Sequence, residues 1–375
     1  MTEKLALWAE IDLGAIKRNV QRVKAMLQPG TALLNVVKAN AYGHGEVETA
    51  RAVIEGGADW LGVARVEEGA ALRNAGIDKP ILLLAEPPAG AIEAAVSHGL
   101  TPSIYTEGAL HAFDRASRAA GKTSAVHLKV DTGMHRYGVP AGSVNAFIDL
   151  IDSLEGLHLK GLWTHFAVAE EVANSFTQQQ HKLFAEVVDS LGERANGLIR
   201  HICNSAGTLT LPEGHYDMVR AGIVTYGIHP SPALAPLVKL EPAMSLRSRV
   251  GLTKRLEAGE AISYGQKYTL AQDGFVSTIP CGYADGLRRS LTNSGEVLIR
   301  GRRYRISGTI TMDHFLVDTG QEELQVGEEV VILGCQGDEC ISAQEMADRI
   351  GTIPYEVVCG ISSRVARVYL DSPGS

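Results

Sequence analysis

The stretch LNVVKANAYGHG, residues 34–45, joins an apolar run to a lysine and then to a turn that contains two glycines. The run before Lys38 is rich in β-branched residues, which is typical of a parallel strand covered on both faces. Gly43 and Gly45 permit positive φ angles and a close backbone approach. Most lysines after a strand only mark its solvent end, but α/β folds bind ligands at the carboxyl ends of parallel strands. A desolvated lysine there loses its proton readily, so Lys38 is a candidate to form a Schiff base.

Short apolar runs recur on both sides of this stretch, with helix-like segments between most of them. Alternation repeated about eight times in roughly 220 residues predicts a (β/α)₈ barrel, an α/β fold. We expect the first short run to lie outside the barrel. The expected strands are Ala9–Leu13, Leu33–Lys38, Trp60–Ala64, Ile81–Ala85, Thr101–Tyr105, Ala125–Val130, Leu157–His165, Ile199–Asn204 and Tyr216–Ala221.

The pattern changes near Lys239, after the proline-rich connector HPSPALAPL. Short strands separated by glycine-containing turns predict a second, mostly-β domain, with one helix at Ser342–Ile350 begun by a Ser342 and Glu345 capping box. We therefore expect a barrel in residues 1–238 and a β-rich domain in residues 239–375. The expected strands are Ser245–Leu256, Phe275–Pro280, Glu296–Ile299, Arg303–Ser307, His314–Asp318 and Glu328–Leu333.

Composition narrows the classes of function. The 375 residues have a formal charge of −8, and no basic stripe suggests a nucleic-acid partner. The N-terminal segment has neither a signal-peptide pattern nor a membrane span. Five cysteines without a CxxC motif predict reduced thiols in the cytoplasm and no metal site.

Charged residues gather near the ends of later strands. In AVHLKVDTGMHRYG, residues 125–138, His127 and Lys129 share one face of the expected strand. One interpretation is a structural ion-pair network, and the other is that Arg136 holds an anion by its guanidinium group. His165 ends another strand, where a packed core histidine is the commoner outcome.

Two further turns suit phosphate. Asn204, Ser205 and Gly207 in HICNSAGT lie at a strand-to-helix junction, and Arg220 precedes Gly222 and Ile223 in VRAGIVTYG. Each signal is weak alone. A phosphate site late in a barrel together with a Schiff-base lysine is what pyridoxal 5′-phosphate requires.

The second domain contains tyrosines in turns, namely Tyr264, Tyr283 and Tyr355. Tyrosines in such turns usually serve as packing residues. They become candidate acids and bases if the barrel of a partner chain faces them.

In this order, the motifs VVKANAYGHG, HLKVDTGMHRYG, THF, CNSA, RAGIVTYG, SYGQKYT, GYADG, MDHF and IPYEVVCGIS resemble those of alanine racemase, from Glu10 to Tyr369. The resemblance implies a fold-type III enzyme that uses pyridoxal 5′-phosphate and works as a head-to-tail homodimer with shared active sites. It also implies interconversion of L-alanine and D-alanine, which supplies D-alanine for peptidoglycan in the cell wall.

The resemblance further implies roles by position. Lys38 would hold the cofactor and act as the base on the D-face, and Tyr264 of the other subunit would act on the L-face. Arg136 and the Met312 N–H would bind the substrate carboxylate. The residues that would bind the cofactor are Lys38, Tyr42, Ser205, Arg220, Gly222, Ile223 and Tyr355.

Supporting roles follow from the same resemblance. A carbamylated Lys129 would position Arg136, while His165 and Arg220 would polarise Tyr264, with Asp313 nearby. Thr309 stands where the family often has arginine, and we expect this change to alter the access corridor and the substrate range.

Alternatives remain open at this stage. The nearest is a broader-specificity racemase that accepts serine or lysine. Others are a decarboxylase of the same fold type, a carrier of the cofactor without catalysis, and a barrel in which Lys38 is an ordinary surface residue.

Overall fold

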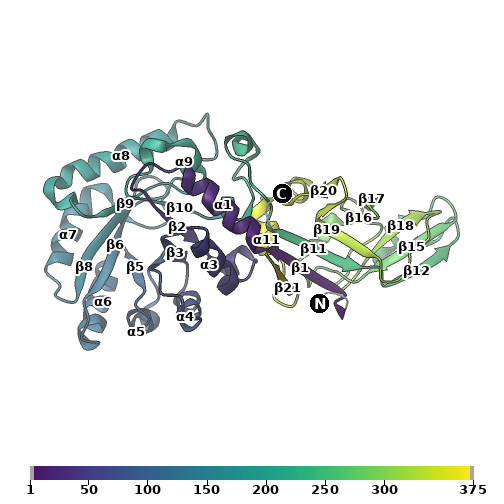
Figure 1. The fold of residues 1–375 in the computed structure, drawn as a ribbon, viewed down its shortest axis with the longest axis horizontal. Coiled ribbons are helices and arrows are strands. Elements are labelled where there is room, and N and C mark those ends of the chain that lie inside the picture. Colours follow the sequence, from purple (N-terminus) through teal and green to yellow (C-terminus); the bar gives the residue numbers. More distant parts are fainter. Residues whose placement is uncertain (1–3, 372–375) are drawn as a thin grey trace. The chain divides into compact units, whose positions relative to one another are not determined.

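The computed structural model describes residues 4–371. Their contacts divide the chain into two compact units. The barrel unit consists of Ile16–Ala41 and Glu46–Glu241. The β unit consists of the residues up to Ala15, Tyr42–Gly45 and the residues from Pro242 onward. The expected fold class is confirmed, because one unit is a parallel barrel with helices and the other is rich in β-sheet (Figure 1).

Eight parallel strands form the barrel sheet. Hydrogen bonds from the Asp217 N–H to the Arg200 carbonyl, 3.1 Å, and from the Arg220 N–H to the Cys203 carbonyl, 3.0 Å, bring its first and last strands together. Each strand matches an expected apolar run. In sheet order the strands are β10 (Met218–Ala221), β2 (Ala32–Val36), β3 (Trp60–Val63), β4 (Ile81–Leu83), β5 (Thr101–Ile104), β6 (Ser124–Asp131), β8 (Leu157–Trp163) and β9 (Ile199–His201), with β7 (Val139–Pro140) beside β6.

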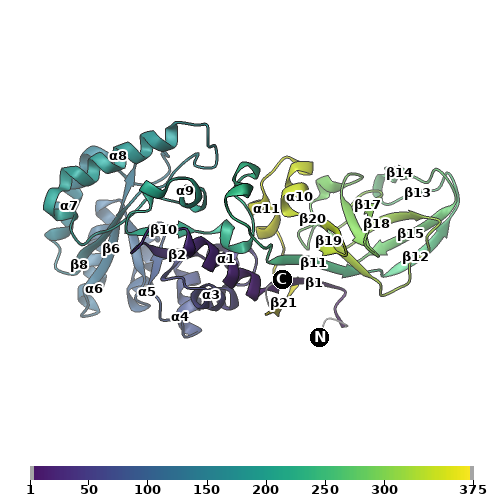
Figure 2. The ribbon, with the colours of Figure 1, turned by 45° about the horizontal axis from the view of Figure 1, so that its top comes forward.

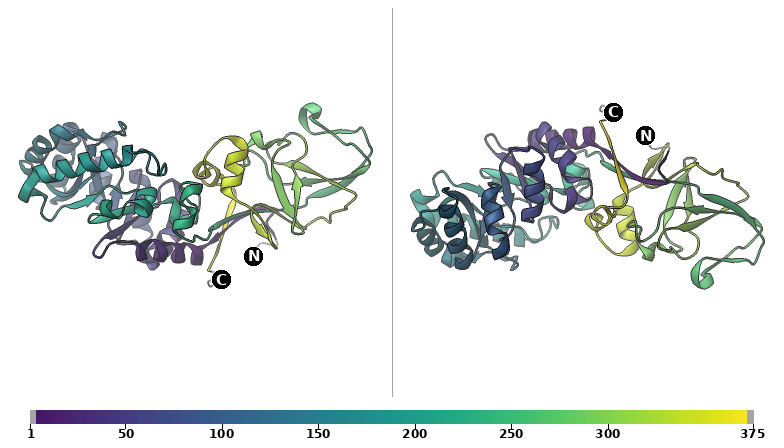
Figure 3. Two further views of the ribbon diagram at one scale, coloured as in Figure 1. Left: turned by 90° about the horizontal axis from the view of Figure 1, so that it is seen from above. Right: turned by 90° about the horizontal axis from the view of Figure 1, so that it is seen from below.

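Helices lie outside these strands when the barrel unit is seen from above and from below (Figure 3). Their apolar sides face the sheet, as Phe184, Val187 and Leu191 do on α8. Among residues 4–371, no helix combines the length and the apolarity needed to cross a bilayer. The main helices are α1 (Leu13–Ala25), α3 (Glu46–Glu55), α4 (Val66–Asn74), α5 (Ile92–Ser97), α6 (Glu107–Ala119), α7 (Val144–Asp152), α8 (Phe176–Leu191) and α9 (Ser205–Thr210).

The β unit contains the first strand of the chain. β1 (Leu7–Asp12) pairs with β11 (Met244–Arg249) and with β21 (Ala366–Leu370), so it lies outside the barrel as expected. The same sheet continues through β19 (Glu329–Gln336), β16 (Glu296–Ile299) and β17 (Arg302–Arg305), and β20 (Glu339–Ile341) pairs with β19. Within the described residues, the β unit has two further sheets (Figure 2). One has three strands, β12 (Leu252–Leu256), β15 (Gly274–Ile279) and β18 (Phe315–Gly320), and the other is a hairpin of β13 (Ala261–Ile262) and β14 (Tyr268–Thr269).

One expected strand is two strands. The sequence predicted a single strand over Ser245–Leu256, but β11 and β12 belong to different sheets. The backbone changes partners between them, since the Val250 N–H bonds to the Glu328 carbonyl and the Gly251 N–H to the Thr278 carbonyl.

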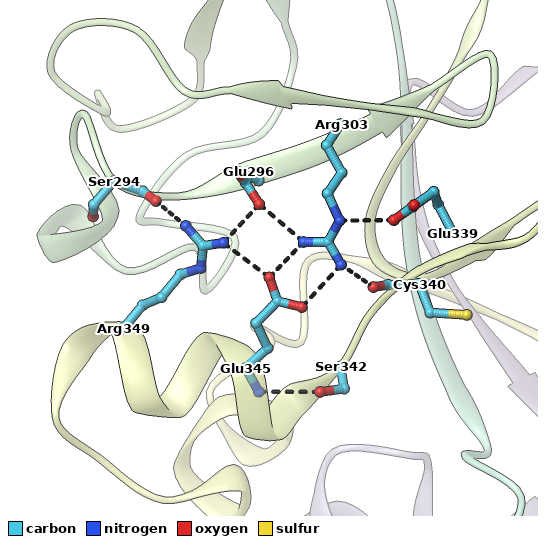
Figure 4. A network of polar contacts seen from close by, with 8 residues as sticks. All are labelled: Ser294, Glu296, Arg303, Glu339, Cys340, Ser342, Glu345 and Arg349. Carbon is cyan, nitrogen blue, oxygen red and sulfur yellow. Dashed lines mark hydrogen bonds and ion pairs between the residues drawn. The ribbon is translucent and has the colours of Figure 1, made fainter.

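An ion network fixes α10 (Ala343–Ile350) against the β16–β17 hairpin (Figure 4). Ser342 caps the helix as expected, with its Oγ accepting from the Glu345 N–H at 3.0 Å. The Glu345 carboxylate, however, accepts from Arg303 Nη1 at 2.6 Å and Arg349 Nη2 at 2.9 Å. It therefore holds a helix against a sheet rather than completing a capping box. The helix α11 (Pro354–Cys359) follows.

The expectation of five reduced thiols is wrong for two of them. Cys335 and Cys340 face each other across β19 and β20, with their Cα atoms 4.1 Å apart, and form a disulfide. A hairpin register brings into contact two residues that no spacing motif had paired. Cys203, Cys281 and Cys359 are not in disulfides, so their expected reduced state is confirmed.

Candidate active site

Lys38 follows β2 and begins a left-handed turn, α2 (Lys38–Tyr42). The φ angles of Ala39, Asn40, Ala41 and Tyr42 lie between 51° and 54°. L-residues avoid this region at a cost of about 1–2 kcal/mol each, so runs of such residues are rare. Gly43 and Gly45 have positive φ angles as expected, at 84° and 95°. The sequence did not reveal that four residues without glycine's freedom precede them.

Neighbouring side chains stabilise this strained turn. Glu68 on α4 accepts hydrogen bonds from the Ala39 N–H at 2.6 Å and from the Ala64 N–H at 2.8 Å. Asn40 Oδ1 accepts from the Glu46 N–H at 3.0 Å. Backbone strain persists where surrounding contacts over-determine it, and it clusters at functional sites. The strained turn after Lys38 is consistent with the prediction that Lys38 is a functional residue.

Lys129 lies inside the barrel among positive charges. Its side chain is buried, with Nζ 4.3 Å from the centre of the Trp163 ring and 5.5 Å from that of Tyr137. Burial, followed by repulsion from Arg136 and Arg220 and more weakly from Lys38, lowers the pKa of Lys129 to about 7. A chain with an overall charge of −8 thus concentrates cations at one end of its barrel.

Arg220 is buried at the end of β10 and donates only to uncharged acceptors. Nη2 bonds to the carbonyls of Thr164 at 2.8 Å and Ile202 at 3.0 Å, and to His165 Nδ1 at 3.1 Å. Nη1 bonds to His201 Nδ1 at 2.9 Å. Burial lowers the pKa of Arg220 to about 9, which still leaves the guanidinium charged at neutral pH.

These contacts fix the tautomers of two further histidines. Arginine can only donate, so His201 Nδ1 accepts, and His201 carries its proton on Nε2. His201 Nε2 lies 2.8 Å from His127 Nδ1, which must then accept. Burial lowers the pKa of both rings. The pKa of His127 falls to about 3. Sequence reasoning noted His127 but missed His201, whose only signal is its place at the start of HICNSAGT.

The two expected phosphate turns meet. Ser205 begins α9, and its Oγ accepts a hydrogen bond from the Gly222 N–H at 2.9 Å. Ile223 begins a short 3₁₀ helix, where the first N–H groups have no partner within the helix. All three residues are buried. The two turns therefore meet at one corner of the barrel, which is the candidate anion-binding corner.

The β unit holds a second group of the expected residues. The rings of Tyr42 and Tyr355 have centres 6.1 Å apart. Burial, with Tyr355 and Cys359 nearby, raises the pKa of Tyr42, so its hydroxyl stays protonated as a donor. Asp313 pairs with Arg364 Nη2 at 2.6 Å.

Tyr264 differs from all of these residues because its side chain is 74% exposed. It lies in the turn between β13 and β14 and borders a hollow of about 500 Å³ that Thr311, His314 and Leu316 also line. Met312 in the same unit is 53% exposed. Thr309 is buried, with 2% of its surface exposed, and its expected effect on the access corridor stays a prediction.

The expected residues thus divide between the two units. The barrel unit contains a lysine, a candidate anion-binding corner and a cluster of cations, and the β unit contains tyrosines. The first group is Lys38, Lys129, Arg136, His165, Ser205, Arg220, Gly222 and Ile223, and the second is Tyr42, Tyr264, Met312, Asp313 and Tyr355. The fold and this site define an enzyme that combines a (β/α)₈ barrel with a β domain.

Comparison with known proteins gives the family. The alanine racemase N-terminal domain family matches residues 11–230, and the C-terminal domain family matches residues 243–369. The chain is 45% identical over 364 residues to an alanine racemase of Symbiobacterium thermophilum, covering 96% of each chain. It is 40% identical to the alanine racemase structure from Streptomyces lavendulae, with a TM-score of 0.92 and 98% of each chain covered. An alanine racemase structure from Clostridium difficile gives 37% identity and a TM-score of 0.93, with 98% of this chain and 96% of that chain covered. The chain belongs to the alanine racemase family and is an isomerase, an amino-acid racemase.

Proposed function

We propose that this protein interconverts L-alanine and D-alanine with pyridoxal 5′-phosphate and two bases, Lys38 and Tyr264. The observation that carries the proposal is the cation cluster around the buried Lys129, on which the charges of Lys38, Arg136 and Arg220 all act. Such a cluster suits a ligand with a phosphate and a carboxylate. Family membership supports alanine as the substrate.

The residues present fit this cofactor. At the corner of Ser205, Gly222 and Ile223, the Ser205 Oγ accepts from the Gly222 N–H, so its own hydroxyl hydrogen can be donated to a phosphate, as can the Ile223 N–H at the start of its helix. Tyr42, whose pKa is raised, is a protonated donor of the kind that a phosphate needs. When bound, the cofactor supplies an electron sink that acidifies the Cα–H of an attached amino acid. Arg220, as a permanent donor, would face the ring nitrogen and keep it unprotonated.

The chain's own side chains then divide the proton transfers. Inversion at one carbon needs a base on each face. Lys38 Nζ takes or returns the proton on the D-face, and Tyr264 Oη does so on the L-face. Tyrosine ordinarily has a pKa near 10, so it needs a cationic, hydrogen-bonded relay such as His165 with Arg220. Arg136 and the Met312 N–H hold the substrate carboxylate, and Asp313 supports this loop.

Lys129 is proposed to carry a carbamate that positions Arg136. With its pKa lowered to about 7, this buried amine is partly uncharged at neutral pH and can attack carbon dioxide. The resulting anion would neutralise part of the cation cluster. A carbamate carbon resonance from ¹³C-bicarbonate in the wild type, absent in Lys129→Ala, tests this. Equal spectra would contradict it.

We also propose the assembly, the domain roles and the metabolic role of the protein. Tyr264 is exposed, so a second copy of the chain is proposed to complete the site as a homodimer. Residues 1–238 would be the cofactor-binding domain and residues 239–375 the β-rich domain, joined at the proline-rich connector. The product D-alanine would serve peptidoglycan synthesis in the cytoplasm.

The test is chiral analysis of L-alanine incubated in D₂O with the protein loaded with pyridoxal 5′-phosphate. L-serine and L-lysine run in parallel. We expect α-deuterated D-alanine to appear fastest. Faster conversion of serine or lysine would support the broader-specificity alternative, and absence of any conversion would refute the two-base proposal.

A further inference from the structure

We infer that Thr309, together with Ser263 and Asn293, forms a clamp on the backbone of Tyr264 that aims its exposed phenol. The inference rests on the proposed function, because it assigns positioning residues to the base that acts on the L-face. It concerns a threonine inside the β unit, 45 residues away from Tyr264 in sequence.

The first observation is a reciprocal pair of hydrogen bonds. Thr309 Oγ1 donates to the Tyr264 carbonyl at 2.7 Å, and Ser263 Oγ donates to the Thr309 carbonyl at 2.6 Å. Thr309 is 2% exposed, so this bond is shielded from water on the threonine side. Two adjacent residues of the turn, Ser263 and Tyr264, are thereby bound to one residue of the segment beside it, Thr309.

The second observation is a bridge at the other end of the turn. Asn293 Nδ2 donates to the Lys267 carbonyl at 2.9 Å, and Asn293 Oδ1 accepts from the Gly308 N–H at 2.6 Å. The asparagine therefore joins the same two segments that Thr309 and Ser263 join. Space is tight there as well, since a Cβ on Gly308 would lie 3.0 Å from Ser263 Cβ.

The third observation is that the turn is strained. Ser263, Gly265 and Gln266 have φ angles of 62°, 74° and 49°, of which only the glycine adopts such values easily. Ordinary packing does not require this conformation, because the Tyr264 side chain is 74% exposed. The hairpin already has its own apolar support in Ile262, Leu270 and Val276.

The turn is strained, and three polar side chains hold its backbone although the Tyr264 side chain is exposed. This combination indicates that the direction of the Tyr264 side chain matters. A base must reach its proton within hydrogen-bond distance, and displacement of about 1 Å costs on the order of 100-fold in rate. The clamp supplies this accuracy from the backbone, so the phenol keeps its direction without packing against its own unit.

The experiment compares three threonine variants of the full-length enzyme loaded with pyridoxal 5′-phosphate. Thr309→Val removes the hydroxyl at nearly constant shape, and Thr309→Ser restores it. Thr319→Val is the matched control, because Thr319 is also buried in the β unit and its Oγ1 donates to the Phe275 and Glu322 carbonyls.

Two readouts separate positioning from folding. In D₂O, D-alanine exchanges its α-hydrogen through Lys38 alone, whereas racemisation also needs Tyr264. We expect Thr309→Val to lower racemisation by roughly 10- to 100-fold while exchange with retention persists. Amide hydrogen exchange of residues 262–267 should accelerate in this variant, and Thr309→Ser should restore both properties.

The inference is overturned if Thr309→Val matches Thr319→Val in the ratio of exchange to racemisation and in the amide exchange of the turn. If Thr309→Val does not fold, Ser263→Ala breaks the same clamp from the turn side and must give the same two changes. A wild-type enzyme that does not racemise alanine would refute the proposed function, while the amide exchange would still test the clamp.

Discussion

The two proposed bases stand on strained turns, but their surroundings are opposite. Lys38 precedes four residues with positive φ angles, and its charge acts with those of Arg136 and Arg220 on the buried Lys129. Tyr264 lies in a clamped turn and has a side chain that is 74% exposed. The barrel unit fixes side chains through buried hydrogen bonds, whereas the β unit fixes a backbone and leaves the side chain open. The difference suits the proposed division of labour, in which the barrel supplies Lys38 and the cation cluster and the β unit supplies an exposed tyrosine to a second chain.

The largest expected effect concerns the lysine side of this comparison. Lys38→Ala removes both the group that attaches the cofactor and one base, so racemisation should fall by at least about 10⁴-fold. Borohydride reduction should label a peptide containing Lys38 in the wild type. Lys182→Ala, an exposed lysine on α8, should keep full activity and labelling. If the label appears on another peptide and Lys38→Ala keeps its activity, Lys38 is not the base that the comparison requires.

The tyrosine side predicts a loss of activity without a loss of stability. Tyr264→Phe removes a hydroxyl that is exposed in the chain, so the thermal unfolding midpoint should stay within about 2 °C of the wild type. Racemisation should fall by roughly 10²- to 10⁴-fold. Calorimetry and chiral analysis of alanine together measure both effects. A destabilised Tyr264→Phe protein would contradict the description of Tyr264 as a side chain that its own unit does not pack.

The barrel side predicts a dependence of stability on pH. Burial lowers the pKa of His127 from 6.5 to about 3, so the unfolded chain binds the proton more readily between these values. The stability that His127 contributes by staying neutral in the folded barrel is therefore fully present above pH 6.5, and it is lost as pH falls toward 3. Between pH 7 and pH 5 the free energy of unfolding should fall by about 2 kcal/mol from this residue.

His127→Asn is the variant that isolates this effect, because its amide oxygen can still accept from His201 but does not titrate. Urea unfolding at both pH values should show a smaller fall in the variant than in the wild type. Equal falls would mean that His127 is not held neutral in the folded barrel.

Much of the barrel followed from sequence, because buried parallel strands are apolar runs that local pattern reveals. The eight strand positions and the place of Lys38 at the end of β2 were predicted in this way. The left-handed turn after Lys38 was not, since Glu68, 29 residues away, supports a conformation that Ala39 and Asn40 do not favour alone.

The features that escaped prediction all depend on contacts that the folded backbone creates between separate segments. His201 gains its role from Arg220 on the neighbouring strand, 19 residues later. Thr309 meets Tyr264 across the β unit, and Cys335 meets Cys340 through the register of a hairpin. Residue type indicated what each side chain can do, and only the fold determined which partner it finds.

The central claim is that one copy of the chain supplies Lys38 and a second supplies Tyr264. Mixing Lys38→Ala chains with Tyr264→Phe chains, under conditions where subunits exchange, tests it most directly. Each mixed dimer would contain one intact site, so random assortment of a two-fold dimer predicts recovery of about a quarter of wild-type activity. If each site forms within one chain, every site lacks a base, and a mixture as inactive as its separate components would contradict the account.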